Sequence, residues 1–340
     1  MKRASENMST SIRIPFYKRD CTNSEIEAVA SCLRSGHLTQ GALVERFEEE
    51  FRDLVGAKYA VAVNSCTSAL FLCLKLLSPK KVSMPSMTFA SVASCVIHAG
   101  GELGWLDESW SGSRYALISS NSKPGVIYDS AHALHRGDAS KKPNDLFCYS
   151  FYPTKNLSGA EGGMIATNNK EYAQWLNKAR WHGRAGKSWD YVIEFPGWKM
   201  NMTDVQAAIG IDYLKRLDEE AAKRKKLLGL YNELLVTSIR SDHIFQTIVD
   251  KRDDFVKFME DNGIECSMHF KPVHKQPAFR QYYKKLPKTE HFEKLIVSLP
   301  LFPSMKNSEV EEVCGLVNEW NRKHPLPRQE YAQFKSFLKA

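Results

Sequence analysis

The sequence of 340 residues has no uninterrupted apolar segment that approaches the ~20 residues needed for a membrane-spanning helix. A typical apolar run, residues 295–302, is short and is interrupted by Pro300. Residues 1–12 are polar and lack the apolar stretch of a signal peptide, so we expect them to form a disordered leader. The sequence therefore predicts neither a membrane span nor a secretory signal.

Several common site motifs are missing as well. The eight cysteines include no C-x-x-C pair, which favours reduced thiols and a cytoplasmic location over a disulfide framework. Ser150 does not lie in a G-x-S-x-G motif, so nothing indicates a hydrolase. Four histidines could suggest a metal site, namely His132, His135, His269 and His274. No acidic residue falls at a characteristic ligand spacing from them, so we expect no metal site.

The formal net charge of +8 does not by itself indicate a nucleic-acid partner. The basic residues are mixed with acidic ones along most of the chain, and no RNP-like, zinc-finger or helix-turn-helix signature accompanies them. A basic pocket for a small phosphorylated ligand explains the charge, and so does a solvated basic surface. We therefore expect no nucleic-acid partner.

What the sequence does contain is an alternation of strand and helix patterns, in a composition typical of a globular protein (43% hydrophobic, 25% charged). Strands are predicted at 59–63, 81–84, 103–107, 115–119, 125–129, 145–151, 243–249 and 264–270, and helices at 23–34, 42–55, 69–77, 89–99, 203–235, 252–262 and 308–320. This order predicts an α/β protein with a mostly parallel sheet flanked by helices. We expect a large domain at 13–215 and a smaller C-terminal α/β domain at 216–340.

The segment 147–163 carries the most specific signal. An apolar strand ends at Ser150, Pro153 forces a turn, and a single lysine, Lys155, is followed by small residues and glycines. A lysine amine becomes a nucleophile toward an aldehyde cofactor when burial or a nearby cation lowers its pKa. Taken alone, Lys155 is better explained as a surface lysine in a turn.

Three further features each follow a predicted strand. A turn of small polar residues, which includes Thr67 and Ser68, opens a helix where phosphate binds well, although many such turns are only helix caps. Phe89 opens the next helix and either stacks on a planar ring or packs in the core. Asp129 ends an apolar strand, where ligands of open α/β sheets bind, or else caps a helix. Together with Lys155, these features supply what pyridoxal 5'-phosphate requires of a protein.

In these segments the chain resembles the DegT/DnrJ/EryC1/StrS sugar aminotransferases, a branch of the fold-type-I pyridoxal phosphate enzymes. The resemblance extends over about residues 13 to 320. The matching segments follow the family's order, at residues 14–16, 36–41, 47–51, 64–70, 85–89, 129–132, 150–155, 161–163, 182–184, 202–208, 271–277 and 298–303.

The resemblance implies a role for each matching residue. Lys155 would hold the cofactor as a Schiff base and move the proton during transamination. Asp129 would keep the pyridine nitrogen protonated, Phe89 would stack on the ring, and His132 would lie near its 3-hydroxyl. The phosphate would be bound by Thr67, Ser68 and Ser150. The family's sites are completed by a partner subunit, so a homodimer is expected, with the large domain as the cofactor-binding one.

The sequence also departs from the family pattern at three places. Cys66 replaces the glycine that usually precedes the phosphate-binding threonine, and Lys199 stands where the partner subunit's asparagine would be, as a cation that could still reach phosphate. Only 21 residues separate Asp107 from Asp129, where the family usually has several tens. Residues 115–119 can still form the strand that the family has here, but residues 108–114 are too few for the helical crossover that usually precedes it.

The resulting prediction is a pyridoxal-phosphate-dependent aminotransferase of amino-sugar and polysaccharide biosynthesis. It would convert a keto-sugar, expected to be nucleotide-linked, to an amino-sugar with glutamate as donor. One alternative is a dehydratase of the related branch in which histidine replaces the lysine, and Lys155 argues against it. The other is a catalytically impaired regulatory or scaffold protein, which the shortened segment, Cys66 and Lys199 keep open.

Overall fold

The computed structural model describes residues 11–110, 112–120, 123–139, 142–186, 189–237, 241 and 243–339. Residues 1–10, most of the expected leader, lie outside the described residues. No described helix combines the length and the apolar character needed to cross a membrane.

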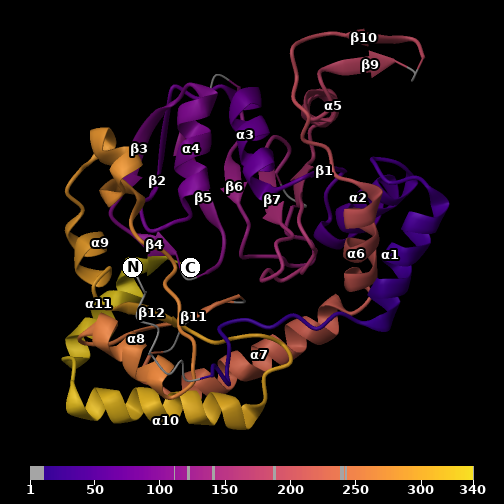
Figure 1. Cartoon of the computed structure of the whole chain (residues 1–340). Coiled ribbons are helices and arrows are strands. Elements are labelled where there is room, and N and C mark those ends of the chain that lie inside the picture. Colours follow the sequence, from indigo (N-terminus) through magenta and orange to yellow (C-terminus); the bar gives the residue numbers. More distant parts are fainter. Residues whose placement is uncertain are drawn as a thin grey trace, which may run out of the picture.

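A seven-stranded sheet forms the centre of the large N-terminal part (Figure 1). Its order across the sheet is β1 (Tyr59–Val63), β8 (Gly163–Thr167), β7 (Leu146–Ser150), β6 (Ile127–Asp129), β5 (Tyr115–Ser119), β2 (Lys81–Pro85) and β3 (Glu102–Leu106). Only β8 and β5 are antiparallel to both of their neighbours, so β1, β7, β6, β2 and β3 share one direction. The predicted α/β class with a mostly parallel sheet is confirmed.

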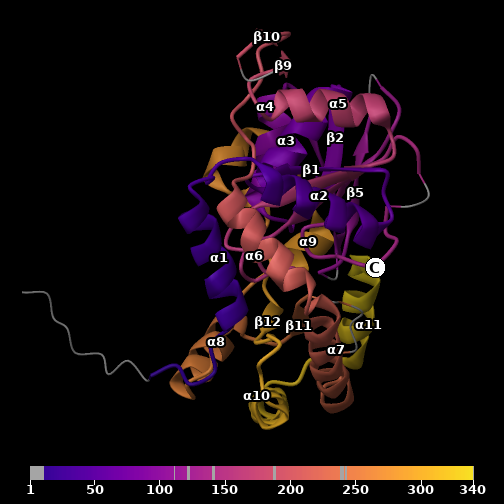
Figure 2. The same cartoon turned by 90° about the vertical axis from the view of Figure 1, so that its right-hand side faces the viewer.

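Helices cover both faces of this sheet. The helices α3 (Cys66–Leu77), α4 (Ala90–Ala99) and α5 (Lys170–Ala179) pack on one face. The other face packs against α2 (Ala42–Val55) and α6 (Asp204–Leu214), with α1 (Asn23–Ser35) beside α6 (Figure 2). Side chains of β7 alternate accordingly, because Cys148 lies in the first core and Phe147 and Tyr149 lie in the second. The two buried faces explain the continuous apolar runs of these strands.

The shortened segment changes the direction of one strand. After β3 the chain forms the short β4 (Ser109–Trp110) and then enters β5, which pairs antiparallel with β2 and β6. A parallel connection needs a crossover of about a dozen residues or more, which residues 107–114 do not provide. The strand expected at 115–119 is therefore present, and it runs opposite to the strands on either side.

The C-terminal part has its own core, built on α7 (Leu217–Leu234), α8 (Arg252–Asp261) and α10 (Asn307–Lys323) around β11 (Phe245–Ile248) and β12 (Ile296–Leu299). Ile14 from the N-terminal segment also packs in this core. Smaller elements complete the C-terminal part, namely the 3-10 helices η1 (Val273–Lys275) and η2 (Pro277–Tyr282), the helices α9 (Pro287–Phe292) and α11 (Arg328–Phe337), and the strand β13 (Leu338–Lys339), which pairs with β4. The division at residue 215 stays a prediction.

Two expectations for this region were wrong. Residues 264–270 form no strand and contact β12 through a single bridge, between Ser267 and Ser298. The partner of β11 is β12, which comes from the apolar run at 295–302, where no strand was predicted. The helix expected at 203–235 breaks into α6 and α7 around Lys215.

The hairpin of β9 (Arg184–Gly186) and β10 (Tyr191–Ile193) was not predicted, and it projects from the body of the molecule (Figure 1).

Candidate active site

A cavity of about 490 Å³ lies beyond the carboxyl ends of the parallel strands. Residues that follow four strands of common direction line it, because Thr67 comes after β1, Phe89 after β2, Asp129 at the end of β6 and Lys155 after β7. Strands of one direction bring their carboxyl ends to the same edge of a sheet, where ligands of such folds bind. The predicted site residues found in its wall are Thr67, Phe89, Asp129, His132, Ser150 and Lys155.

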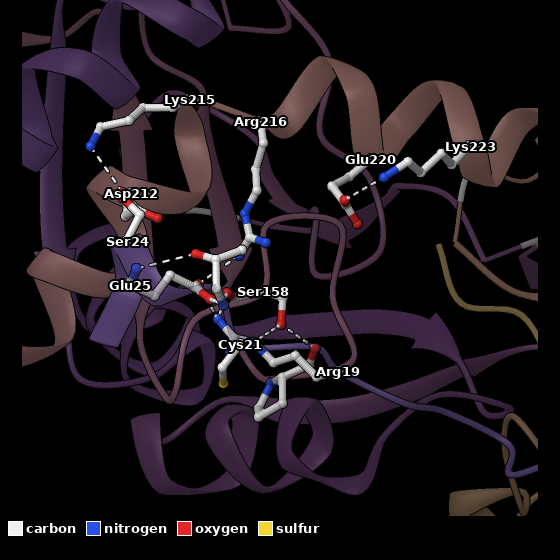
Figure 3. A network of polar contacts seen from close by, with 12 residues as sticks. Arg19, Cys21, Ser24, Glu25, Ser158, Asp212, Lys215, Arg216, Glu220 and Lys223 are labelled. Atoms are coloured by element: carbon white, nitrogen blue, oxygen red, sulfur yellow. Dashed lines mark hydrogen bonds and ion pairs between the residues drawn. The ribbon is translucent and has the colours of Figure 1, made fainter. Parts of the chain in front are cut away.

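The loop that carries Lys155 is held at both ends by the N-terminal segment. Arg19 donates from Nε to the Oγ of Ser158 (2.7 Å) and from Nη2 to its carbonyl oxygen (3.0 Å), as Figure 3 shows. The Ser158 hydroxyl donates to the carbonyl oxygen of Pro153 (2.5 Å), and the Tyr17 hydroxyl donates to the same carbonyl oxygen. The turn around Lys155 is thus fixed by side chains far away in the sequence.

A buried carboxylate, Glu25, connects this loop to the helices of the opposite face (Figure 3). Its Oε1 lies 2.5 Å from Nη2 of Arg19 and 2.7 Å from Nη2 of Arg216, which stands between α6 and α7. Its Oε2 accepts a hydrogen bond from the backbone N–H of Thr22, the N-cap residue of α1 (3.1 Å). One acid therefore joins the N-terminal segment, the lysine loop and the break between α6 and α7.

The amine of Lys155 is suited to act as a nucleophile. Burial lowers its pKa to about 8, although the carboxylate of Asp129 opposes this shift. At pH 8 about half of such amines are neutral, whereas an ordinary lysine with a pKa near 10.4 is almost fully charged. A neutral amine is the form that attacks an aldehyde.

Asp129 is a buried carboxylate, 7% exposed, with two hydrogen-bond donors. Its Oδ1 accepts from the backbone N–H of Ala131 (3.0 Å), and its Oδ2 accepts from the hydroxyl of Tyr115 (3.0 Å). Burial raises the pKa of Asp129, and these two donors and the nearby Lys155 oppose the rise. The net effect is a raised pKa, and a cationic ligand group beside Asp129 would favour its ionised form.

The N-terminus of α3 faces the cavity through Thr67. Ser65 is the N-cap residue, and its side chain accepts a hydrogen bond from the N–H of Ser68 (3.1 Å). The β8 strand approaches this helix end so closely that a Cβ on Gly163 would lie 2.6 Å from the backbone nitrogen of Cys66. Only glycine fits there, and the close contact fixes a helix end whose dipole favours anions.

Comparison with known proteins identifies the family. Residues 19–108 and 114–318 match the DegT/DnrJ/EryC1/StrS aminotransferase family. The chain belongs to this family. The match is interrupted between residues 108 and 114, where the crossover is missing from the fold. As a member of the family, the chain is a pyridoxal-phosphate-dependent transaminase.

Individual relatives agree with this assignment. The chain is 32% identical to the spore coat polysaccharide biosynthesis protein SpsC of Bacillus subtilis (strain 168), over 87% of this chain and 94% of SpsC. Its fold is similar to that of Spr1654, a putative sugar aminotransferase of Streptococcus pneumoniae in its PMP form (TM-score 0.82, 22% identity, 92% of this chain and 100% of that one). The fold is also similar to that of Helicobacter pylori PseC, an aminotransferase involved in the biosynthesis of pseudoaminic acid (TM-score 0.80, 19% identity, 91% and 99%).

The residues present fit the cofactor of this aminotransferase family. The cavity offers a buried carboxylate at Asp129, an exposed aromatic ring at Phe89 and the amine of Lys155, a residue of intermediate exposure. The Nδ1 atom of His132 is buried and has no hydrogen-bond partner among the described residues. This is expected of an atom whose hydrogen-bond partner is a bound ligand.

Two of the predicted site residues do not line the cavity. The hydroxyl of Ser68 donates to Oδ1 of Asn64 (2.6 Å) within the turn before α3. Lys199 pairs with Trp181 in an isolated bridge, and its amine donates to the side chain of Asn201. The family resemblance assigns Lys199 to the site of the partner subunit, which a single chain does not contain.

The sequence-based prediction missed part of the wall. Trp110, Tyr115, His243 and His269 all line the cavity. The ring of His132 lies 4.3 Å from that of Trp110 and 4.3 Å from that of His243. Burial lowers the pKa of His243 well below its usual range and that of His269 to about 3, so both imidazoles are neutral at neutral pH. They come from a part of the chain more than a hundred residues after His132, and nothing in their local sequence indicates that they meet it.

Proposed function

We propose that the chain transfers an amino group to a keto-sugar, with glutamate as the donor and a nucleotide-linked sugar as the acceptor. The observation that carries the proposal is the joint placement of Lys155, Asp129 and Phe89 in one cavity of a family aminotransferase. The names of the relatives support a sugar, because SpsC is a polysaccharide biosynthesis protein and PseC is involved in making pseudoaminic acid. The formal net charge of +8 suits a phosphorylated acceptor.

Pyridoxal phosphate, when bound, supplies an electron sink for proton removal from the amino donor. The proposed roles of the protein side chains follow from their chemistry. Lys155, whose pKa of about 8 lies close to neutral pH, accepts and returns the proton. Asp129 holds a proton on the ring nitrogen, Phe89 covers one face of the ring, and His132 contacts the ring hydroxyl. We further propose Thr67, Ser68 and Ser150 for the phosphate.

The proposal includes a homodimer located in the cytoplasm. Lys199 would then contribute its amine to the phosphate site of the partner subunit. All eight cysteines are free in the structure, as expected in a reducing compartment.

The decisive experiment follows the absorbance of the purified protein loaded with pyridoxal phosphate. Added glutamate should convert the bound cofactor to its pyridoxamine form, and a screen of nucleotide-linked keto-sugars should find one that reverses the change. Lys155→Ala should abolish both conversions. A spectrum that glutamate leaves unchanged would favour the scaffold alternative, whereas deoxygenation of the sugar without amination would favour the dehydratase.

A further inference from the structure

The reversed strand β5 places a tyrosine beside the carboxylate of the candidate active site. Tyr115 is the first residue of β5 and lies opposite Asp129, the last residue of β6, in the ladder between the two strands. A strand parallel to β6 would begin at the amino end of β6, on the side of the sheet away from the cavity. Its first residue could not reach the site. The short connection from β3 thus brings the start of β5 to the cavity.

The hydroxyl of Tyr115 is the central link of a hydrogen-bonded chain. It donates to Oδ2 of Asp129 (3.0 Å) and lies 2.7 Å from Oγ1 of Thr88. A tyrosine hydroxyl has one proton, and a carboxylate only accepts, so the Thr88 hydroxyl must donate to the oxygen of Tyr115. Each donor in this chain polarises the next and strengthens the final bond to Asp129.

Packing fixes the ring of Tyr115. The indole of Trp110 stacks on it, with 5.9 Å between ring centroids and 29° between planes, and Trp110 is itself 5% exposed. The hydroxyl is therefore held in place before any ligand arrives.

We propose that Tyr115 is a positioning residue for the cofactor: its hydroxyl orients Asp129 and keeps it ionised for the pyridine nitrogen. This inference depends on the proposed placement of the cofactor over Asp129. Burial alone would favour the neutral acid, and the backbone N–H of Ala131 is the only other hydrogen-bond donor to this carboxylate within the described residues.

The other titratable groups facing Asp129 cannot replace Tyr115. The thiols of Cys66, Cys95 and Cys148 lie near it on α3, α4 and β7, and burial raises the pKa of each, so they are uncharged at neutral pH. The amine of Lys155 is the remaining charge, and as the proposed Schiff-base lysine it would be taken up by the cofactor.

The test compares Tyr115→Phe with the wild type in binding pyridoxal phosphate, titrated by absorbance into cofactor-free protein. Loss of the hydroxyl should weaken binding about tenfold, or about 1.4 kcal/mol. Because the carboxylate loses a donor, its pKa should rise, and binding should fail at a higher pH than in the wild type as the pH is lowered. A purely structural role would lower the melting temperature of the cofactor-free protein without moving this midpoint.

Tyr128→Phe is the matched control. Tyr128 lies on β6 next to Asp129, on the opposite face of the sheet, where its hydroxyl accepts a hydrogen bond from Lys142 (2.5 Å). This substitution should leave the affinity for pyridoxal phosphate unchanged. Thr88→Val should weaken binding about threefold, and the double variant with Tyr115→Phe should bind no more weakly than Tyr115→Phe alone, because Thr88 acts through the tyrosine.

Equal affinity and an equal midpoint in Tyr115→Phe and wild type would overturn this inference alone. A wild type that bound no pyridoxal phosphate would overturn the cofactor placement, and with it the inference.

Discussion

At the scale of single residues, Lys155 gives the cofactor-free protein a pH-dependent stability. Its folded pKa of about 8 lies below that of an unfolded lysine, so the unfolded chain binds more protons between about pH 8 and 10.4. Stability from this group therefore rises with pH in that window. We expect Lys155→Met to stabilise the cofactor-free protein at pH 7, and to lose about 2 kcal/mol of that advantage by pH 10. Urea unfolding of both proteins at the two pH values measures this, and a constant difference would contradict it.

Gly163 lies against the start of α3, where we propose that the phosphate binds, and the backbone there leaves no room for a side chain. An alanine Cβ would meet the backbone of Ser65 and Cys66 at 2.6 Å, and backbone at a helix start cannot move aside cheaply. Gly163→Ala should lower the free energy of unfolding by about 2–3 kcal/mol and weaken cofactor binding. Gly229→Ala is the matched control, since Gly229 lies inside α7 with no atom within 4 Å of the added Cβ. It should stabilise by about 0.5–1 kcal/mol, and equal effects of the two changes, measured by urea unfolding, would refute the close-contact argument.

At the scale of elements, the buried Glu25 connects α1 to the lysine loop and to the start of α7. Glu25→Gln keeps the shape but leaves the guanidinium groups of Arg19 and Arg216 without their shared anion. We expect a loss of about 3 kcal/mol in unfolding free energy, because breaking a buried ion pair leaves an uncompensated charge. Glu27→Gln, two residues along the same helix, removes only the exposed pair with Arg34 and should change stability by less than about 0.5 kcal/mol. Similar losses for both variants, measured by urea unfolding, would show that the network does not stabilise the fold.

The sequence predicts elements well where local pattern decides them. The helix α2 and the strands β1 and β5 have the predicted bounds, because their apolar spacing matches the faces they bury. Tertiary contacts decide the rest. The helical propensity of 203–235 is continuous, yet the chain breaks around Lys215, next to the point where Arg216 pairs with Glu25. Residues 264–270 have a strand-like sequence but form only two isolated bridges, from Ile264 to Ile14 and from Ser267 to Ser298, so they stay irregular.

At the scale of the whole molecule, the sequence predicts those site residues that lie at the carboxyl ends of the parallel strands. Asp129 ends a strand, and Phe89, Thr67 and Lys155 each follow one, so the common direction of these strands places all four in one cavity. The wall around them depends on packing between distant segments, which no local pattern encodes. Tyr115 could be predicted only in part. The short connection in the sequence indicates that no crossover precedes β5. The reversed direction of β5, which brings its first residue to the site, is known only from the structure.

The described chain leaves apolar side chains exposed on the projecting hairpin and on α1. Val192 and Ile193 of β10 are 63% and 49% exposed, and Ile26 and Leu33 of α1 are 59% and 54% exposed. Exposed clusters of this kind mark interaction surfaces. The hairpin also precedes Lys199, the residue proposed for the site of the partner subunit, by a few positions. We therefore expect a homodimer in which this hairpin contacts the second copy.

Replacing Val192 and Ile193 together by aspartate should convert the dimer to a monomer of unchanged fold, because two carboxylates at an apolar contact would have to be buried without partners. Light scattering of the wild type and the variant gives the masses, and far-ultraviolet circular dichroism checks the fold. Ile118→Asp is the control, since Ile118 is similarly exposed (59%) but lies on β5. Its mass should remain that of a dimer. A dimeric double variant would place the contact elsewhere, and a monomeric wild type would remove Lys199 from the proposed site.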